Sequence, residues 1–210
     1  LVRDTANEME ATIRHLNASL PDLLPGYQVK ILDGNVLAAT EHRLKVLRQT
    51  NSAPMPGKSL VVLDPALMLA VDVFPCEDGH AQERSLLTGV LPSVEAGDVW
   101  IADRNFCTNK FLFGIADREG YFVIWQHQCL SWHSQTELQQ CGSAEGRQVF
   151  EQTISLSDDD GQLLLLRRVQ VHLDEPTRDG DQDIFILTNL PIGAASATLI
   201  SKLYRQRWTL

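Results

Sequence analysis

The feature that most constrains the fold is a series of short apolar segments between residues 27 and 125, each closed by turn residues. Three of them follow one another and two more alternate with helical patterns, giving the order β-β-β-α-β-α-β. Asp64-Pro65 forms a tight turn signal between the second and third segments, which favours an antiparallel hairpin. A meander followed by alternating helices and strands predicts an α/β fold with a mixed sheet flanked by helices. The expected strands are 27–32, 59–63, 67–74, 99–102 and 121–125, and the expected helices are 83–90 and 109–118.

The remaining segments divide the chain into four parts. Residues 4–19 are expected to form a helix, because Met9, Ile13 and Leu16 follow the i, i+4, i+7 pattern, and Asp4 is a candidate cap for it. A short basic helix is expected at 41–49. After Trp125, three more apolar segments occur without an intervening helix, which predicts a β-rich insertion. The expected division is 1–26 (helix and connector), 27–125 (first part of the core), 126–192 (insertion, with strands at 149–156, 163–173 and 184–189) and 193–210 (start of the last helix).

Charge is unevenly distributed along the chain. The formal net charge is 18 − 27 = −9, which argues against a protein that simply coats nucleic acid. Residues 149–183 hold nine acids and three bases, so we expect the acidic turns at 158–161 and 174–183 to point away from any DNA-binding surface. The basic residues gather in one loop and in the last helix: Arg43, Lys45, Arg48, Lys202, Arg205 and Arg207.

Two features of the composition favour a cytoplasmic protein that does not contact a membrane. No apolar run reaches the roughly 18 residues that a membrane helix needs. The four cysteines show neither disulfide-framework nor C-x-x-C spacing, so reduced thiols are expected.

Asp33 and Asp103 each follow an apolar segment at the point where a strand is expected to end. We expect these two strands to be neighbours, because the antiparallel second and third strands pair on the other edge of the first. Neighbouring strand ends can bring two carboxylates together, and such a pair repels itself unless a hard cation lies between the oxygens. Mg²⁺ suits that position because it prefers oxygen ligands and retains waters and substrate phosphates. The alternative is that both are ordinary turn aspartates, since aspartate is common after strands.

The last helix carries a second candidate feature. Ile200, Tyr204 and Arg207 follow the i, i+4, i+7 pattern and are expected to form one exposed stripe, beside an apolar stripe of Leu199, Leu203 and Leu210 that faces the core. A tyrosine and an arginine on an exposed stripe could bind a DNA phosphate. The alternative is an amphipathic helix with a solvated basic edge.

Three segments, in this order, resemble a known family. Leu32-Asp33-Gly34-Asn35 and Ala102-Asp103-Arg104-Asn105-Phe106 are similar to the first and second aspartate motifs of the insertion-sequence-four family of bacterial transposases. Tyr204-Arg205-Gln206-Arg207-Trp208-Thr209-Leu210 resembles the start of that family's Y-x-x-R-W-x-[IL]-E signature. The resemblance implies an RNase H-like catalytic core with a β-rich insertion before the last helix.

The resemblance also implies a reaction and its residues. Asp33 and Asp103 would be catalytic and would bind two Mg²⁺ or Mn²⁺ ions, with a third acid immediately beyond Leu210. The chain would then be an excerpt, inactive alone, whose last helix is truncated. Tyr204 and Arg207 would contact DNA phosphate at the cleaved end. The protein would nick double-stranded DNA at a transposon end and transfer the strand, as a homodimer in a synaptic complex in the bacterial cytoplasm.

Other functions remain open. One is an RNase H-like nuclease without strand transfer, and another is a domesticated DNA-binding protein that has lost catalysis. A zinc site at His127, Cys129, His133 and Cys141 fits no standard spacing. The alternating Asp179, Asp181 and Asp183 lack the rest of a calcium loop, so they are expected to form an acidic turn.

The tryptophans have different expected roles. Trp100 and Trp125 fall inside strands and are expected in the core. Trp132 lies in a polar loop, where it could stack on an unpaired base or anchor the loop.

Overall fold

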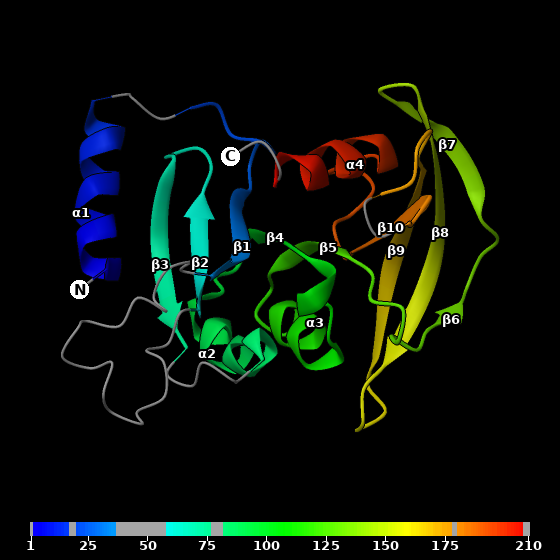
Figure 1. Ribbon diagram of the computed structural model, residues 1–210, viewed down its shortest axis with the longest axis horizontal. Helices are drawn as coiled ribbons and strands as arrows, with labels where there is room; N and C mark the ends of the chain where they lie inside the picture. Colours follow the sequence, from blue (N-terminus) through cyan, green and yellow to red (C-terminus); the bar gives the residue numbers. More distant parts are fainter. Residues whose placement is uncertain (1, 17–19, 37–57, 77–81, 178–179, 208–210) are drawn as a thin grey trace, which may run out of the picture.

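The computed structural model describes residues 2–16, 20–36, 58–76, 82–177 and 180–207. Within these residues, ten strands form one mixed sheet in the order β3-β2-β1-β4-β5-β10-β9-β8-β6, and β7 pairs with β8 (Figure 1). Helices lie against this sheet, so the mixed α/β architecture expected from the sequence is confirmed.

The first five strands form the centre of the molecule. β1 (Gln28–Val36) pairs antiparallel with β2 (Lys58–Asp64), and β2 pairs antiparallel with β3 (Leu69–Pro75). On its other side β1 pairs parallel with β4 (Asp98–Ala102), which in turn pairs parallel with β5 (Tyr121–Trp125). The hairpin expected between the second and third strands is therefore present.

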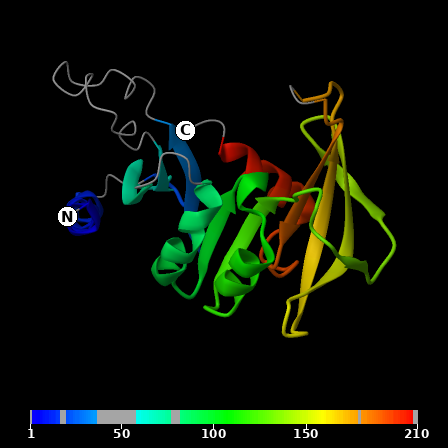
Figure 2. The same ribbon diagram turned by 60° about the horizontal axis from the view of Figure 1, so that its bottom comes forward.

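The β-rich stretch after β5 continues the same sheet. β8 (Arg147–Ser157), β9 (Leu163–His172) and β10 (Asp183–Thr188) pair antiparallel with one another in turn, and β10 pairs antiparallel with β5. Figure 2 shows these long strands at the side of the molecule away from α1. The short strands β6 (His133–Ser134) and β7 (Gln139–Ala144) were not predicted, because they are almost entirely exposed and lack apolar alternation.

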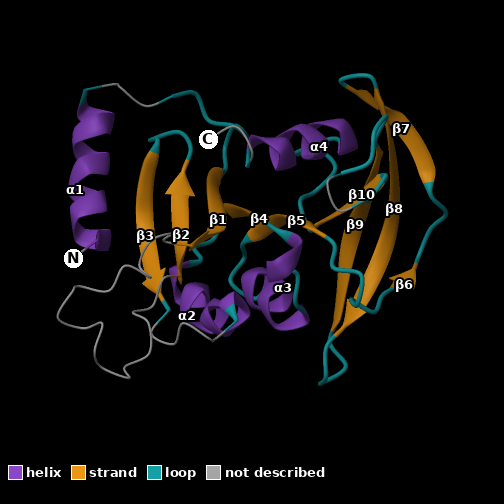
Figure 3. Ribbon diagram, in the orientation of Figure 1, coloured by secondary structure: helices purple, strands orange, loops and turns teal. Residues whose placement is uncertain are grey.

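Helices cover both faces of the central strands (Figure 3). α2 (Leu87–Val90) and α3 (Asn109–Ala116) lie on one face, and α4 (Ala197–Gln206) lies on the other. A 3-10 turn, η2 (Glu83–Leu86), precedes α2, so the expected helix 83–90 is a 3-10 turn followed by one α-helical turn.

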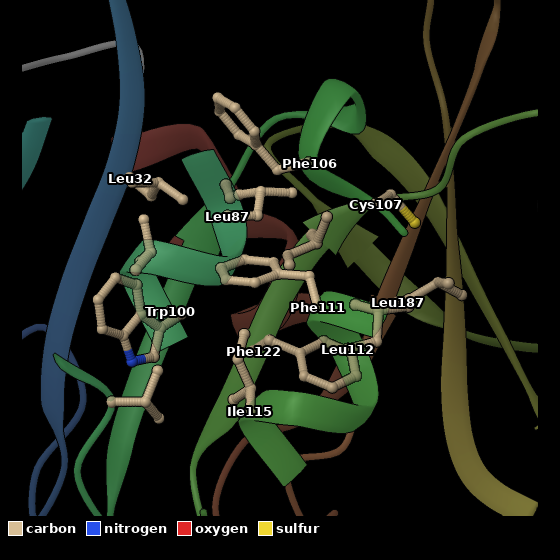
Figure 4. Close-up of a cluster of buried hydrophobic side chains, with 14 of the residues drawn as sticks. Leu32, Leu87, Trp100, Phe106, Cys107, Phe111, Leu112, Ile115, Phe122 and Leu187 are labelled. Atoms are coloured by element: carbon tan, nitrogen blue, oxygen red, sulfur yellow. The ribbon is translucent and has the colours of Figure 1, made fainter. Parts of the chain in front are cut away.

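The core has two parts because β1, β4 and β5 are buried on both faces, as parallel strands usually are. Between the sheet and α2 and α3 lie large apolar side chains (Figure 4), which include Leu32, Trp100, Phe111, Ile115 and Phe122. The opposite face packs beneath α4, with Val29, Ile31, Val99, Ile200 and Leu203 among its members. Each fully buried side chain of this size contributes roughly 1.5–3 kcal/mol, so the strands that carry the site rest on a rigid support.

One ion pair is buried at the start of the central strands. The Lys30 ammonium lies 2.8 Å from an Asp98 carboxylate oxygen, and both side chains are nearly inaccessible. Asp98 also accepts a hydrogen bond from the Glu95 amide at 2.8 Å, and Lys30 lies 5.6 Å from the centre of the Trp100 ring. Trp100 is fully buried, as expected.

The first helix, α1 (Val2–His15), packs against the edge of the sheet with few buried residues. It lies along β3, where Arg3 pairs with Asp72 and Ala6 is its buried residue. The helix expected from the spacing of Met9, Ile13 and Leu16 is confirmed, although Met9 is 46% exposed and Leu16 is 66% exposed. Asp4 lies in the first turn rather than capping the helix.

Candidate active site

Asp33 and Asp103 lie at the same end of the parallel pair formed by β1 and β4. β1 and β4 are parallel neighbours, and Leu32 opposite Ala102 is the last pair in their register. The two aspartates are the next residue on each strand, so the expectation that these strands are neighbours is confirmed. β1 was expected to end at Asp33, but it continues to Val36 because residues 33–36 pair with β2.

A single guanidinium joins the two carboxylates. Nη1 of Arg207 lies 3.2 Å from Oδ1 of Asp33, and its Nη2 lies 3.7 Å from Oδ1 of Asp103. The Arg207 side chain is 4% exposed, whereas those of Asp33 and Asp103 are 57% and 33% exposed. The cation therefore holds the pair from the protein interior while both carboxylates remain open to solvent.

Each aspartate also makes a local hydrogen bond of the kind found in turns. Oδ1 of Asp103 accepts from the Arg104 amide at 2.6 Å and caps the 3-10 turn η4 (Arg104–Phe106). Oδ1 of Asp33 accepts from the Gly34 amide at 3.0 Å. Each carboxylate thus has a fixed direction as well as a shared partner.

The face of α4 that approaches this site is buried. Ile200, Tyr204 and Arg207 form the expected i, i+4, i+7 stripe, but all three are inaccessible, so the prediction of an exposed stripe is wrong. α4 lies across the sheet, and Ile200 and Tyr204 pack in the second core. Arg207 reaches the aspartates because this stripe faces inward.

The Tyr204 hydroxyl is buried beside the two aspartates and Arg207. It makes no hydrogen bond of acceptable geometry with any residue that the structure describes. Burial raises the pKa of Tyr204 well above its usual value, and the neighbouring Arg207 guanidinium offsets this only in part. The phenol is therefore a neutral donor at physiological pH. Its ring meets the Trp125 ring edge-on, with centroids 6.5 Å apart.

Arg104, the residue after Asp103, contacts two residues from other parts of the chain. Its guanidinium lies 4.7 Å from the centre of the Trp125 ring, and its Nη1 lies 2.9 Å from Oδ2 of Asp181. Trp125 is half-buried and packs against the second core, so the expectation that it lies in the core is met only in part. Asp181 belongs to the acidic turn 174–183, so the expectation that this turn points away is wrong. The ion pair with Arg104 explains its position and neutralises its charge.

The other predicted DNA-binding residues lie elsewhere. Lys202 and Arg205 are exposed on the outer side of α4, where Arg205 pairs with Glu145. The expected basic helix 41–49 lies outside the described residues, as do the remaining three candidates, Arg43, Lys45 and Arg48. The structure therefore brings Tyr204 and Arg207 to the aspartates and leaves Lys202 and Arg205 on the adjoining surface.

Sequence reasoning did not identify two residues that hold the turn after β4. Oε2 of Glu83 accepts a hydrogen bond from the Asn105 side-chain amide at 3.1 Å. Nε of Arg84 donates to the Asn105 carbonyl oxygen at 2.7 Å and to its Oδ1 at 3.1 Å. Glu83 and Arg84 carry no sequence signal, because they occur in an ordinary helical pattern far along the chain from either aspartate.

The weaker metal hypotheses find no support in the geometry. Within the described ranges, no three His, Cys, Asp or Glu side chains form a cluster that could hold a metal ion, including those predicted as zinc candidates: His127, Cys129, His133 and Cys141. Asp181 pairs with Arg104, and Asp183 accepts a hydrogen bond from Gln170 at 2.9 Å. Asp179 lies outside the described residues.

Trp132 anchors its loop. It packs against the first core, and the Arg168 guanidinium lies 4.6 Å from its ring centre. Arg168 also lies 3.7 Å from the centre of the Phe185 ring. Of the two expected roles, the structure therefore supports the anchor.

No protein-family model matches this chain, and no curated protein matches it. Among the described helices, none is long and apolar enough to cross a membrane. The function must therefore be inferred from the residues and their geometry.

Proposed function

We propose that this chain carries the catalytic core of a DNA transposase, in which Asp33 and Asp103 hold divalent metal ions. One observation carries the proposal: two carboxylates that follow the last pair in the parallel register of β1 and β4 contact the same buried guanidinium. Two acids gathered around one cation form a site that suits positive charge.

The donor set fits Mg²⁺ or Mn²⁺. Both carboxylates supply oxygen atoms, which these ions prefer, and both are open enough to share an ion with water and phosphate. Two such ions, when bound, activate the attacking oxygen and stabilise the leaving oxygen in phosphoryl transfer. Asp33 and Asp103 would orient the ions, since the backbone amides of Gly34 and Arg104 fix the two carboxylates.

The residues of α4 would bind and orient the DNA. Arg207 carries a planar fork of donors that matches a phosphate, and the Tyr204 hydroxyl is a neutral donor beside it. Both side chains are buried in this structure, so DNA would reach them only after the contact between Arg207 and the two carboxylates opens. Lys202 and Arg205 add positive charge on the adjoining surface. The substrate would be a double-stranded transposon end, with a homodimer holding two ends together.

The proposed reaction has two steps. In the first, the oxygen of water attacks a phosphorus atom and the bond from phosphorus to the 3′-oxygen breaks, which frees a 3′-hydroxyl. In the second, this 3′-oxygen attacks a phosphorus atom of the target DNA, and the target's own 3′-oxygen leaves. The same metal-holding carboxylates serve both steps.

The RNase H-like assignment of strands β1 to β5 is part of this proposal. The three parallel strands β1, β4 and β5 and the antiparallel β2 support this assignment, which goes further than the mixed α/β architecture itself. The sheet does not end at β5 but continues through β10, β9 and β8. The β-rich stretch would then be an extension of the catalytic sheet.

A non-catalytic DNA-binding protein is the second candidate. The contact between Arg207 and both carboxylates favours it, because that contact offsets one of the two negative charges without any ion. In such a protein the pair would stabilise the fold, and the basic surface of α4 would bind DNA.

Cleavage and strand transfer by the full-length gene product that carries this chain would separate these functions. The substrates are a plasmid bearing the genomic sequences that flank the gene, and a pre-cut duplex of the same ends. We expect Mn²⁺-dependent nicking and joining that Asp33→Ala and Asp103→Ala abolish. The matched control is Asp159→Ala, which removes an exposed aspartate of a distant turn.

Each other outcome has a distinct meaning. Nicking without joining of the pre-cut ends would identify a nuclease. DNA binding without nicking would identify the non-catalytic protein. Activity that survives both aspartate substitutions would refute the assignment of the site.

A further inference from the structure

The carboxylate of Glu83 lies between the two chain segments that carry the aspartates. On one side Oε2 accepts a hydrogen bond at 3.1 Å from the side-chain amide of Asn105, two residues after Asp103. On the other side the same carboxylate rests against Gly34, the residue after Asp33. A single side chain from η2 therefore touches both segments at the end of the parallel β1–β4 pairing.

Gly34 leaves the space that Glu83 occupies. A Cβ atom at position 34 would lie 2.7 Å from Oε1 of Glu83 and 2.9 Å from its Oε2, closer than real Cβ atoms come. Successive strand residues face opposite sides of a sheet. Asp33 contacts Arg207 below α4, and position 34 faces Glu83 on the other side. Glu83 thus packs against β1 on the face of the sheet opposite the two carboxylates.

Arg84 adds two further hydrogen bonds to Asn105. Its Nε donates to both the backbone carbonyl and the side-chain Oδ1 of Asn105, so the amide is held at both ends. Asn105 lies inside η4, the 3-10 turn that Asp103 caps through its own carboxylate. Fixing Asn105 therefore fixes the turn that sets the direction of the Asp103 side chain.

We propose that Glu83 is a positioning residue that sets the distance between Asp33 and Asp103, with Gly34 and Asn105 as its two contact points. The inference rests on the proposed function, in which those aspartates hold a metal ion. Glu83 itself does not touch the ion. It acts because an ion shared by two carboxylates binds tightly only when their separation is held near the value that the ion requires.

The test measures Mn²⁺ affinity of the protein by calorimetry, alongside its melting temperature. Removing an outer support of a metal site typically weakens binding about 10–100-fold, so we expect Glu83→Ala to weaken Mn²⁺ binding by at least about tenfold. Glu83→Gln retains an oxygen that can accept the hydrogen bond from Asn105, so it should bind Mn²⁺ nearly as tightly as the wild type. A residue with only a general structural role would not show this selective rescue at a constant melting temperature.

Gly34→Ala gives a second, independent perturbation. The three atoms nearest to its new methyl group all belong to the end of the flexible Glu83 side chain, so the carboxylate should move away from Asn105 while the fold persists. Mn²⁺ binding should weaken as in Glu83→Ala. The double variant Glu83→Ala/Gly34→Ala should be no worse than Glu83→Ala alone, because the methyl group then meets no carboxylate; residues in direct contact are expected to be non-additive.

Asp33→Ala and Asp103→Ala separate this inference from the proposed function. If they weaken Mn²⁺ binding but Glu83→Ala does not, or if the effects of Glu83→Ala and Gly34→Ala simply add, Glu83 has no positioning role. If the aspartate variants bind Mn²⁺ like the wild type, the proposed metal site is itself wrong and the inference fails with it.

Discussion

Replacing Arg207 by methionine should have opposite effects on metal binding and on DNA binding. Methionine retains an apolar stem that can fill much of the buried space but removes the charge that joins Asp33 and Asp103. In the wild type, a metal ion must compete with the Arg207 guanidinium for the two carboxylates, and in the variant this competition is absent. Mn²⁺ binding should therefore become tighter, although the variant has lost a residue of the proposed active site.

The size of the effect follows from the distances and exposure. Two unit charges 4 Å apart attract by about 1 kcal/mol in water and about 4 kcal/mol at an effective dielectric constant of 20. Arg207 is buried, but the side chains of Asp33 and Asp103 are 57% and 33% exposed, so water screens the attraction. The attraction energy is therefore expected in the lower part of the range from about 1 to about 4 kcal/mol, at about 1 to 2 kcal/mol. A difference of about 1.4 kcal/mol corresponds to a tenfold change in affinity. We therefore expect Mn²⁺ to bind on the order of tenfold more tightly.

The assay combines calorimetry with melting curves in EDTA and in Mn²⁺. In EDTA the variant should melt below the wild type, because the two carboxylates repel each other, and Mn²⁺ should restore more stability to the variant than to the wild type. Binding to cleaved DNA ends should weaken, and its salt dependence should fall by about one phosphate contact. The matched control is Arg205→Met, an exposed position on the same helix, which should leave Mn²⁺ affinity unchanged. Equal Mn²⁺ affinity in Arg207→Met and the wild type would show that the guanidinium does not occupy the position of the ion.

Three further expectations test other parts of the structure. Tyr204→Phe removes a buried hydroxyl that has no hydrogen-bond partner among the described residues, so thermal stability should not fall, while binding to DNA ends should weaken by about 1 kcal/mol; a large loss of stability would contradict this. Lys30→Met leaves a buried carboxylate without its cation and should destabilise the protein by about 3–5 kcal/mol in urea unfolding, whereas no change would show that the pair is solvated. Burial raises the pKa of the Cys107 thiol to about 11, so native protein at pH 8 should react with a thiol reagent at Cys129 and Cys141 only; modification of Cys107 in the native state would mean that this core opens readily.

The sequence predicted those features that depend on local pattern. Apolar segments bounded by turn residues placed the central strands within a few residues, and the meander followed by alternating elements placed Asp33 and Asp103 on neighbouring strands. The short polar strand β7 escaped prediction because its pairing with β8 comes from backbone hydrogen bonds, which leave no apolar signal.

Features that depend on how distant elements pack could not be predicted. The periodicity of α4 identified its stripes, but not that Ile200 and Tyr204 face the sheet, since that depends on where the insertion strands lie. The contact between Arg104 and Asp181 joins residues 77 positions apart, and no pattern in either segment predicts it. The position of Glu83 behind Gly34 likewise became visible only in three dimensions.

The guanidinium that holds the two aspartates together comes from a residue 174 positions away from Asp33. Between them the chain must complete the central strands, close β10 against β5 and dock α4 across both parts of the sheet. Contacts of such high sequence separation form late, because loop closure must precede them. We therefore expect the carboxylate pair to form among the last steps of folding, so that a partly folded chain would expose two uncompensated aspartates and would have no assembled site with which to act on DNA.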